Sequence, residues 1–176
     1  MVEEKKKMKS VIYTAPGEFS FSADAKEIPV PGPNQVLIRI ECAIIHPTDT
    51  YFLAGQYKGE YSYPLIPGLE GSGTVIASGG GFYAWTLTGK RVSFTRILER
   101  AGKYSKDGTY AEYCVTDSVK CIPIDDNMSF EQAASGICNP LSALGLLEKV
   151  IEKKATAVIQ TAANSQMGRM MNRLLG

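Results

Sequence analysis

The chain has 176 residues, of which 44% are hydrophobic and 21% are charged. These fractions are typical of globular domains, so they exclude a disordered chain and a coiled coil, and the length fits one domain with at most an incomplete second one. Lys and Arg number 19 against 18 Asp and Glu, for a net charge of +1, which argues against a broad basic surface for nucleic acid or anionic lipid.

The N-terminal segment Met1–Ser10 holds four lysines, and we expect a solvated, frayed terminus there. No run of the chain approaches the ~18 apolar residues that cross a bilayer, and no apolar stretch of the secretory type follows the charged start. The cysteines form no C-x-x-C pair; they are Cys42, Cys114, Cys121 and Cys138. Most lie in apolar or alternating segments, where a thiol usually acts as a small hydrophobic side chain. We therefore expect a reduced, cytoplasmic protein that binds neither membranes nor nucleic acid.

Short strands punctuated by glycine and proline are predicted over the first two thirds of the chain. Apolar residues recur at every second position from Val36 to Cys42, which is the period of a half-buried strand. The proline-rich segment Pro29–Pro33 is predicted to be an extended connector. Many short strands at this spacing are typical of a compact antiparallel barrel. Further strands are expected at Gly71–Ser78, Lys90–Phe94, Thr109–Thr116 and Ser118–Ile122.

Helices are predicted beyond Pro123. Ser129-Phe-Glu-Gln132 has the pattern of a capping box, in which the Ser and Gln side chains bond each other's backbone N–H groups. Asn139-Pro140 is typical of a second helix start, with Asn as the N-cap and proline at the first helical position. Apolar residues then follow at three- and four-residue spacing, which predicts the core face of a helix. They are Leu141, Leu144, Leu147 and Ile151.

The last segment begins like a parallel α/β unit. Thr156–Thr161 is predicted to be a short apolar strand, and small residues and a helical run to Gly176 follow it. The order helix, strand, small-residue turn and helix is that of a nucleotide-binding α/β domain. A parallel strand needs neighbours and helices on both faces, and the chain supplies only this one.

Seven segments of the chain together form a family pattern in order and spacing: Ile45–Asp49, Gly55–Tyr57, Pro67–Gly73, Gly89–Val92, Gly108–Tyr113, Ser129–Ala134 and Asn139–Ala143. They resemble the medium-chain dehydrogenase/reductase superfamily, and the match runs from about Lys9 to the C-terminus. The resemblance is nearest to the zinc-independent branch, the quinone oxidoreductases and enoyl thioester reductases. Val158–Gly168 is similar to the enoyl-reductase form of the nucleotide loop in particular.

The resemblance implies a mainly β fold: a GroES-like barrel followed by a truncated α/β beginning of the Rossmann type. We expect residues 1–124 to form the GroES-like catalytic domain. Residues 125–176 would then be the first part of an incomplete nucleotide-binding Rossmann domain. The strands that complete such a domain, and the segment that returns to the barrel in relatives, are absent from the sequence.

Zinc divides the members of this superfamily. The resemblance places the three ligand positions of the catalytic zinc at His46, Leu69 and Cys138, and a leucine cannot coordinate a metal. Glu70, next to it, is a remote substitute. The structural zinc lobe of relatives needs a cluster of four cysteines, and Arg96–Lys106 contains none. We therefore expect no metal in this protein.

Two residues are the candidate catalytic groups. His46 is predicted to be a polar wall of the active cleft that donates a hydrogen bond or a proton to a substrate oxygen; the alternative is that it packs beside Pro47 and fixes a loop. By the resemblance, Tyr51 lies near the nicotinamide, where its phenol would donate to the oxygen that gains charge when hydride adds to a conjugated system. A half-buried structural aromatic residue is the alternative for Tyr51.

The segment Ala162–Gly168 is the candidate phosphate loop, because it follows the predicted strand and opens a helix. Its small residues would let a pyrophosphate approach the helix N-terminus, with Asn164 and Ser165 as side-chain donors and Gly168 as the fingerprint glycine. A plain strand–helix turn is the alternative.

Two more cofactor contacts come from the resemblance, in which the helix starting at Asn139 lies against the nicotinamide. Ser142 is a candidate contact to the cofactor amide, whereas Asn139 is more simply a helix cap. NADPH is the expected cofactor, with NADH as the open alternative, and the expected partner is a small-molecule substrate.

The function expected for the full-length parent is an NADPH-dependent oxidoreductase that transfers hydride to an activated double bond or a quinone without zinc. One alternative is a relative of the zinc-containing alcohol dehydrogenases, which metal analysis would reveal. Another is a non-catalytic GroES-like interaction module. We also expect a homo-oligomer formed through Ala155–Gly176, because a lone apolar strand is an open template for pairing.

Overall fold

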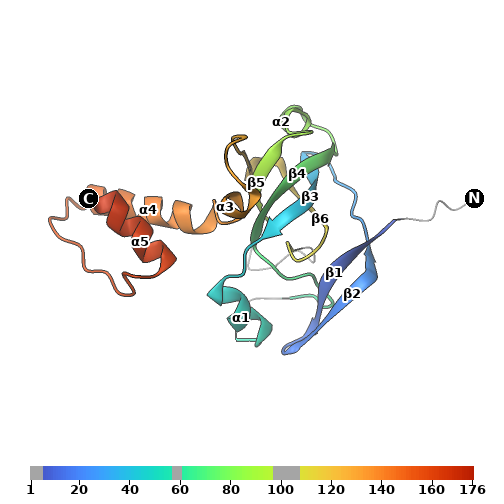
Figure 1. Cartoon of the computed structure of the whole chain (residues 1–176), viewed down its shortest axis with the longest axis horizontal. Coiled ribbons are helices and arrows are strands. Elements are labelled where there is room, and N and C mark those ends of the chain that lie inside the picture. The colour runs from blue at the N-terminus through green and yellow to red at the C-terminus, as the bar shows by residue number, and fades with distance from the viewer. Residues whose placement is uncertain (1–5, 57–60, 97–107) are drawn as a thin grey trace, which may run out of the picture.

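The computed structural model describes residues 6–56, 61–96 and 108–176 and shows a mainly β fold followed by helices (Figure 1). The expected fold class is therefore confirmed. The strands are β1 (Lys7–Ala15), β2 (Glu18–Glu27), β3 (Gln35–Ala43), β4 (Glu70–Ser78), β5 (Arg91–Thr95), β6 (Tyr113–Asp117) and β7 (Cys121–Pro123). The helices are α1 (Pro47–Leu53), α2 (Phe82–Thr86), the 3₁₀ turn η2 (Ser118–Lys120), α3 (Phe130–Ala134), α4 (Cys138–Glu152) and α5 (Gln166–Leu175).

A five-stranded antiparallel sheet in the order β6-β3-β4-β5-β7 forms the barrel. The strands predicted from Val36, Gly71 and Lys90 onward are confirmed as β3, β4 and β5. The strand predicted over Thr109–Thr116 begins only at Tyr113, and Ser118–Ile122 divides into η2 and β7.

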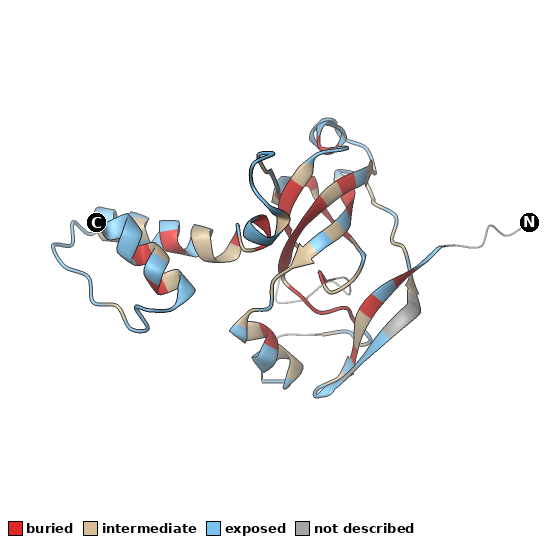
Figure 2. Ribbon diagram, viewed as in Figure 1, coloured by how far each residue is buried: buried red, intermediate tan, exposed pale blue. Residues whose placement is uncertain are grey.

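The core lies inside this curved sheet, where the buried segments of the strands meet in Figure 2. It is filled by side chains that alternate along the strands, as the period of two predicts. The cluster includes Val36, Ile38, Val75, Ala84, Leu87, Val92, Phe94, Cys114 and Cys121. All four cysteines are free thiols, in keeping with the expected reduced state.

Strands β3 and β4 approach each other so closely that glycine is required between them. A Cβ atom placed on Gly73 would lie 2.1 Å from the backbone oxygen of Arg39, and one on Gly71 would lie 2.7 Å from that of Cys42. Glycine permits such close backbone contact. This packing fixes the start of β4, which carries Glu70 into the interior.

Strand β1 corrects the expectation of a frayed N-terminus for residues 7–10. It pairs antiparallel with β2 in a separate two-stranded sheet, and Met8 and Ser10 are 1% and 2% exposed. The Lys9 backbone N–H donates to the Glu112 carboxylate, and the Glu112 N–H donates to the Lys9 carbonyl. These long-range bonds hold the lysine-rich segment in place, and no local sequence pattern predicts them.

The capping box at Ser129 is confirmed, since Gln132 N–H donates to Ser129 Oγ and Ser129 N–H donates to Gln132 Oε1, both at 3.2 Å. The short helix α3 that it starts packs on β3, β4 and β5. The domain boundary at residue 124 stays a prediction.

The α/β segment departs from its prediction. Helix α4 projects from the barrel and α5 folds back along it (Figure 1), but Thr156–Thr161 forms no strand. The predicted core face of α4 is also wrong: Leu141, Leu144 and Ile151 are at least half exposed. Both results have one cause, because a parallel strand and its flanking helix are stable only against neighbouring strands, which the described chain does not contain.

Candidate functional site

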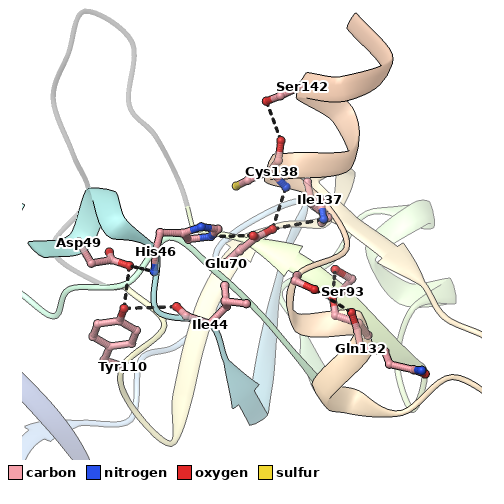
Figure 3. A network of polar contacts seen from close by, with 12 residues as sticks. Ile44, His46, Asp49, Glu70, Ser93, Tyr110, Gln132, Ile137, Cys138 and Ser142 are labelled. Atoms are coloured by element: carbon pink, nitrogen blue, oxygen red, sulfur yellow. Dashed lines mark hydrogen bonds and ion pairs between the residues drawn. The ribbon is translucent and has the colours of Figure 1, made fainter. Parts of the chain in front are cut away.

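A chain of polar contacts joins three elements at one end of the barrel (Figure 3), and Glu70 is its centre. Glu70 is the first residue of β4 and is 0% exposed. Its Oε1 lies 2.7 Å from His46 Nε2, while its Oε2 accepts the backbone N–H groups of Ile137 at 3.2 Å and Cys138 at 2.8 Å. A buried carboxylate needs such partners, because an unpaired buried charge is strongly unfavourable.

His46 is the N-cap residue of α1, and Pro47 follows at the first helical position. Its backbone N–H donates to Asp49 Oδ2 at 2.7 Å, so both the main chain and the imidazole are held. The His46 side chain is 11% exposed. The structure therefore buries most of this side chain with Nε2 against Glu70, and the polar wall of an active cleft stays a prediction for His46.

Asp49 has a second donor in Tyr110, whose hydroxyl lies 2.8 Å from Asp49 Oδ2 and 3.2 Å from the Ile44 carbonyl. Burial of the phenol raises the pKa of Tyr110 far above its usual value of about 10, and the hydrogen bond to Asp49 and its charge raise it further. The phenol therefore stays protonated and acts as a fixed donor. Asp49 is 2% exposed, and its local hydrogen bonds fix the loop.

The free backbone N–H groups at the N-terminus of helix α4 are bound by a residue from another element. The N-cap residue is Ile137, which has no side-chain cap bond, and the first N–H groups are bound instead by Glu70. The predicted capping role of Asn139 is therefore wrong. Asn139 lies within the first turn, where proline at position 140 costs no hydrogen bond because those N–H groups lack helical partners.

Cys138 brings a thiol to the same place, and its sulfur lies beside the His46–Glu70 pair in Figure 3. The ligand atoms of His46, Glu70 and Cys138 all lie within 4.8 Å of one another. Burial raises the pKa of the Cys138 thiol to about 12, and the charge of Glu70 contributes to the shift. Nitrogen, oxygen and sulfur donors in one cluster are the ligand types that zinc takes in proteins, so the donor set fits a metal although Leu69 does not.

Tyr51 lies outside this network. It is on α1 and its side chain is 58% exposed, and among the described hydrogen bonds none involves its hydroxyl. The structure thus leaves Tyr51 on the surface of the helix that His46 starts, where a substrate could reach it.

The predicted phosphate loop lies elsewhere, at the start of α5. Ser165 is the N-cap, and its Oγ accepts the Gly168 N–H at 3.0 Å, so this hydroxyl caps the helix. Ala162 has a left-handed φ of 51°, and a Cβ on Gly168 would lie 2.5 Å from the Ala162 oxygen. Asn164 is exposed in the turn. The turn is therefore tight and built of small residues, which fits the approach of a pyrophosphate to a helix N-terminus.

The cofactor candidates fall into two groups. Ser142 is on the exposed side of α4, where its hydroxyl donates to the Cys138 carbonyl at 2.7 Å, so Ser142 and Asn139 lie near the Glu70 cluster. Ser165 and Gly168 instead line a hollow of about 630 Å³ between α4 and α5, with apolar walls that include Val150 and Met171.

Sequence reasoning missed the roles of Glu70 and Tyr110. The carboxylate of Glu70 follows Leu69 directly, and an acidic residue within an otherwise apolar, glycine-rich strand start is the signal that could have marked it as buried and paired. Its partners at positions 137 and 138 are distant in the sequence, so no local pattern identifies them.

Residues 32–126 match the family of the alcohol dehydrogenase GroES-like domain. A zinc-type alcohol dehydrogenase-like protein of Schizosaccharomyces pombe is 35% identical over 120 residues, which is 68% of this chain and 34% of that protein. A mitochondrial enoyl-[acyl-carrier-protein] reductase of Caenorhabditis elegans is 32% identical over 140 residues, or 79% of this chain and 38% of that protein.

Solved structures agree with these matches. A protein from Mesorhizobium loti, assigned as an NADPH:quinone reductase, has a TM-score of 0.82 at 32% identity. The match covers 98% of this chain and 52% of that protein. A mycobacterial protein in complex with NADPH has a TM-score of 0.70 at 27% identity, and the match covers 94% of this chain and 48% of that protein. The chain thus spans about half, or less, of the length of these proteins. Among the residues described, no helix is long and apolar enough to cross a membrane.

Proposed function

Because this chain belongs to the medium-chain dehydrogenase/reductase superfamily, through its alcohol dehydrogenase GroES-like domain, we propose that it is the substrate-binding part of an NADPH-dependent oxidoreductase. The reaction is hydride transfer to an activated carbon–carbon double bond or a quinone. The names of the similar proteins, an enoyl reductase and a protein assigned as a quinone reductase, support this reaction class. The mycobacterial complex supports NADPH as the hydride donor.

The observation that carries the proposal is the fixed position of His46. The reduced nicotinamide, when bound, supplies the hydride. Negative charge then develops on the substrate oxygen, and a donor already in place lowers the energy of that state. Glu70 holds Nε2 of His46 and Asp49 holds its backbone N–H, so Nδ1 is the ring nitrogen proposed to face a substrate. Nδ1 donates to the substrate oxygen when both ring nitrogens carry a proton.

Tyr51 is the second donor in this proposal. Its exposed phenol is on the helix that His46 starts, and it can deliver a hydrogen bond to the same oxygen. The roles of Asn164, Ser165 and Gly168 are to let the cofactor pyrophosphate approach the N-terminus of α5. Ser142 and Asn139 are the proposed neighbours of the nicotinamide.

We propose that this reduction needs no metal, because Leu69 occupies a ligand position of the zinc-dependent relatives. A zinc-dependent alcohol dehydrogenase is the second candidate, and the cluster of His46, Glu70 and Cys138 favours it, as does the similarity to the zinc-type protein. Alcohol oxidation that appears only after zinc is added, and enone reduction that resists a chelator, are the results that separate the two.

The first test is NADPH and NADH binding to the 176-residue chain by calorimetry. Fluorescence of the single tryptophan, Trp85, is unsuitable, because Trp85 is on α2, away from the start of α5 (Figure 1). Binding tighter than ~100 μM would mean that a working site forms. Assays with enones and quinones then follow, in which His46→Ala and Tyr51→Phe should each lower kcat.

If neither nucleotide binds, the reductase proposal fails for this chain alone. Specific capture of a partner protein by the barrel would then support the interaction module.

We also propose a cytoplasmic location, which the four free cysteines support. Cell fractionation tests it, and recovery in an oxidising compartment would contradict it.

A further inference from the structure

We propose that Tyr110 is a positioning residue for His46, because it ties the loop that carries His46 to the segment that carries Glu70. This inference rests on the proposed function, in which His46 donates to the substrate. The hydroxyl of Tyr110 lies 2.8 Å from Asp49 Oδ2 and 3.2 Å from the Ile44 carbonyl oxygen. It therefore contacts the chain both before and after His46 in the sequence (Figure 3).

The main chain of Tyr110 is held by two other segments of the barrel. Its N–H donates to the Pro67 carbonyl at 3.0 Å, and its carbonyl accepts the Val11 N–H of β1 at 2.9 Å. The ring lies so close to Gly68 that a Cβ atom there would be 2.8 Å from Tyr110 Cδ1. Gly68 comes two positions before Glu70, so the phenol projects from a fixed point beside the segment that carries this carboxylate.

Asp49 connects the Tyr110 hydroxyl to the main chain of His46. Its Oδ2 accepts two hydrogen bonds, one from the Tyr110 hydroxyl at 2.8 Å and one from the His46 backbone N–H at 2.7 Å. The N–H of Asp49 donates in turn to the His46 carbonyl at 2.9 Å. Because Asp49 is 2% exposed, water does not readily replace a lost donor at this carboxylate. The Tyr110 hydroxyl therefore helps to hold the main chain at His46 in one place.

The same two segments are joined a second time by the contact of His46 Nε2 with Glu70 Oε1 at 2.7 Å. That contact requires a fixed separation between the loop and the start of β4, which the tie through Tyr110 maintains. A displacement of about 1 Å at a reacting group can lower a rate by ~10²-fold, so side chains that support such a group affect the rate without touching the substrate. Without the hydroxyl, we expect the His46 ring to leave Glu70 for part of the time.

Tyr110→Phe is the variant that tests this tie, because phenylalanine keeps the ring and the main-chain bonds and removes only the hydroxyl. His46 is the only histidine in the chain, so its imidazole NMR signals are unambiguous. In Tyr110→Phe we expect these signals to broaden and to shift toward those of an unstructured histidine. Tyr83→Phe is the matched control: Tyr83 is on α2, and its hydroxyl donates to the Cys121 carbonyl at 3.4 Å. Its loss should leave the imidazole signals unchanged.

A second measurement requires no variant. In the wild type, the hydroxyl of Tyr110 and the backbone N–H of His46 both donate to Asp49 Oδ2. The hydroxyl proton should therefore exchange slowly with water and show a nuclear Overhauser effect to the His46 amide proton. A freely exchanging hydroxyl, identical imidazole signals in Tyr110→Phe and the wild type, or an equal shift in Tyr83→Phe would overturn the proposal.

Kinetics separate this inference from the proposed function. If the chain reduces enones with NADPH, Tyr110→Phe should lower kcat by about tenfold or more and leave KM for NADPH within about twofold, because the tie acts on His46 and not on the nucleotide. An unchanged kcat would overturn the positioning role. If the wild type reduces nothing, the proposed function fails, whereas the NMR comparison still decides whether Tyr110 holds His46.

Discussion

Glu70 illustrates how one buried side chain organises a site. Its two carboxylate oxygens serve different elements, since Oε1 holds His46 and Oε2 holds the first N–H groups of α4. A carboxylate accepts at both oxygens, whereas an amide accepts at one and donates at the other. A carboxylate can therefore accept from both sides at this position, whereas an amide fits only where Nε2 of His46 is itself the acceptor.

We predict that Glu70→Gln lowers the free energy of unfolding by about 1–3 kcal/mol. The neutral amide oxygen bonds the backbone N–H groups of Ile137 and Cys138 more weakly than a carboxylate oxygen does. Its NH₂ group then faces His46 Nε2, which loses the acceptor it has in the wild type if that nitrogen carries the proton. Chemical denaturation measures the effect. Glu41→Gln is the matched control, because Glu41 pairs with Arg39 on the surface, where the loss should stay below about 0.5 kcal/mol. Equal losses in the two variants would contradict the prediction.

We predict that the buried thiol of Cys121 makes the free energy of unfolding depend on pH. Burial raises the pKa of its thiol to about 12, with a further contribution from the charge of Asp117. Below the pKa of an unfolded thiol, about 8.5, the full stabilisation is present. Above it the thiol ionises in the unfolded chain but not in the folded one, so the free energy of unfolding falls until about pH 12. Between pH 8.5 and 10 the loss is about 2 kcal/mol.

The measurement is the free energy of unfolding at pH 8 and pH 10 for the wild type and for Cys121→Ala. Other groups titrate in this range, so the informative quantity is the difference between the two proteins. That difference should shrink by about 2 kcal/mol as the pH rises, because the variant has no thiol to ionise. A difference that is constant with pH would show that the thiol ionises equally well in both states.

At the scale of the elements, local sequence patterns correctly predicted those strands and helix starts that contacts between nearby residues or a single core face stabilise. The alternation from Val36 to Cys42 gave β3, because every second side chain enters the barrel core, and the Ser129–Gln132 pattern gave the start of α3. Thr156–Thr161 has the composition of a strand but does not form one, because the described chain contains no neighbouring parallel strand with which it could pair. The site divides in the same way: the resemblance placed His46, whereas the bonds from Glu70 to the start of α4 join residues more than sixty positions apart.

Two glycines in different elements should respond oppositely to alanine. In β4, a Cβ on Gly73 would meet the Arg39 backbone oxygen at 2.1 Å, while in α4 one on Gly145 would meet nothing within 4 Å. Gly73→Ala must push β3 and β4 apart, and we expect a loss of several kcal/mol, consistent with other severe backbone clashes. Gly145→Ala should stabilise the chain by up to about 1 kcal/mol through helix propensity.

Thermal denaturation of the two variants, at equal protein concentration, checks this pair. A lower Tm for Gly73→Ala and an equal or higher Tm for Gly145→Ala are the expected results. If Gly73→Ala kept the wild-type Tm, the close approach of β3 and β4 would not be a requirement of the fold.

At the scale of the whole molecule, the barrel has a closed core and the segment beyond it does not. Buried residues gather within the strands, whereas α4 and α5 bury little between them (Figure 2). Ile159 is 98% exposed and Val158 is 43% exposed, next to the half-exposed leucines of α4. An extended apolar segment that no strand covers is a template for pairing with another chain.

We therefore predict that the 176-residue chain self-associates through Ala155–Gly176, with a molar mass that rises with concentration in light scattering. Ile159→Lys should shift the chain toward the monomer, because a charge buried in the new contact would be unpaired. Val30→Lys is the matched control: Val30 is 84% exposed but lies on the connector before β3, so its replacement should leave association unchanged. A wild-type chain that stays a monomer at high concentration would contradict the prediction, and equal effects of the two lysines would assign the association to general surface hydrophobicity.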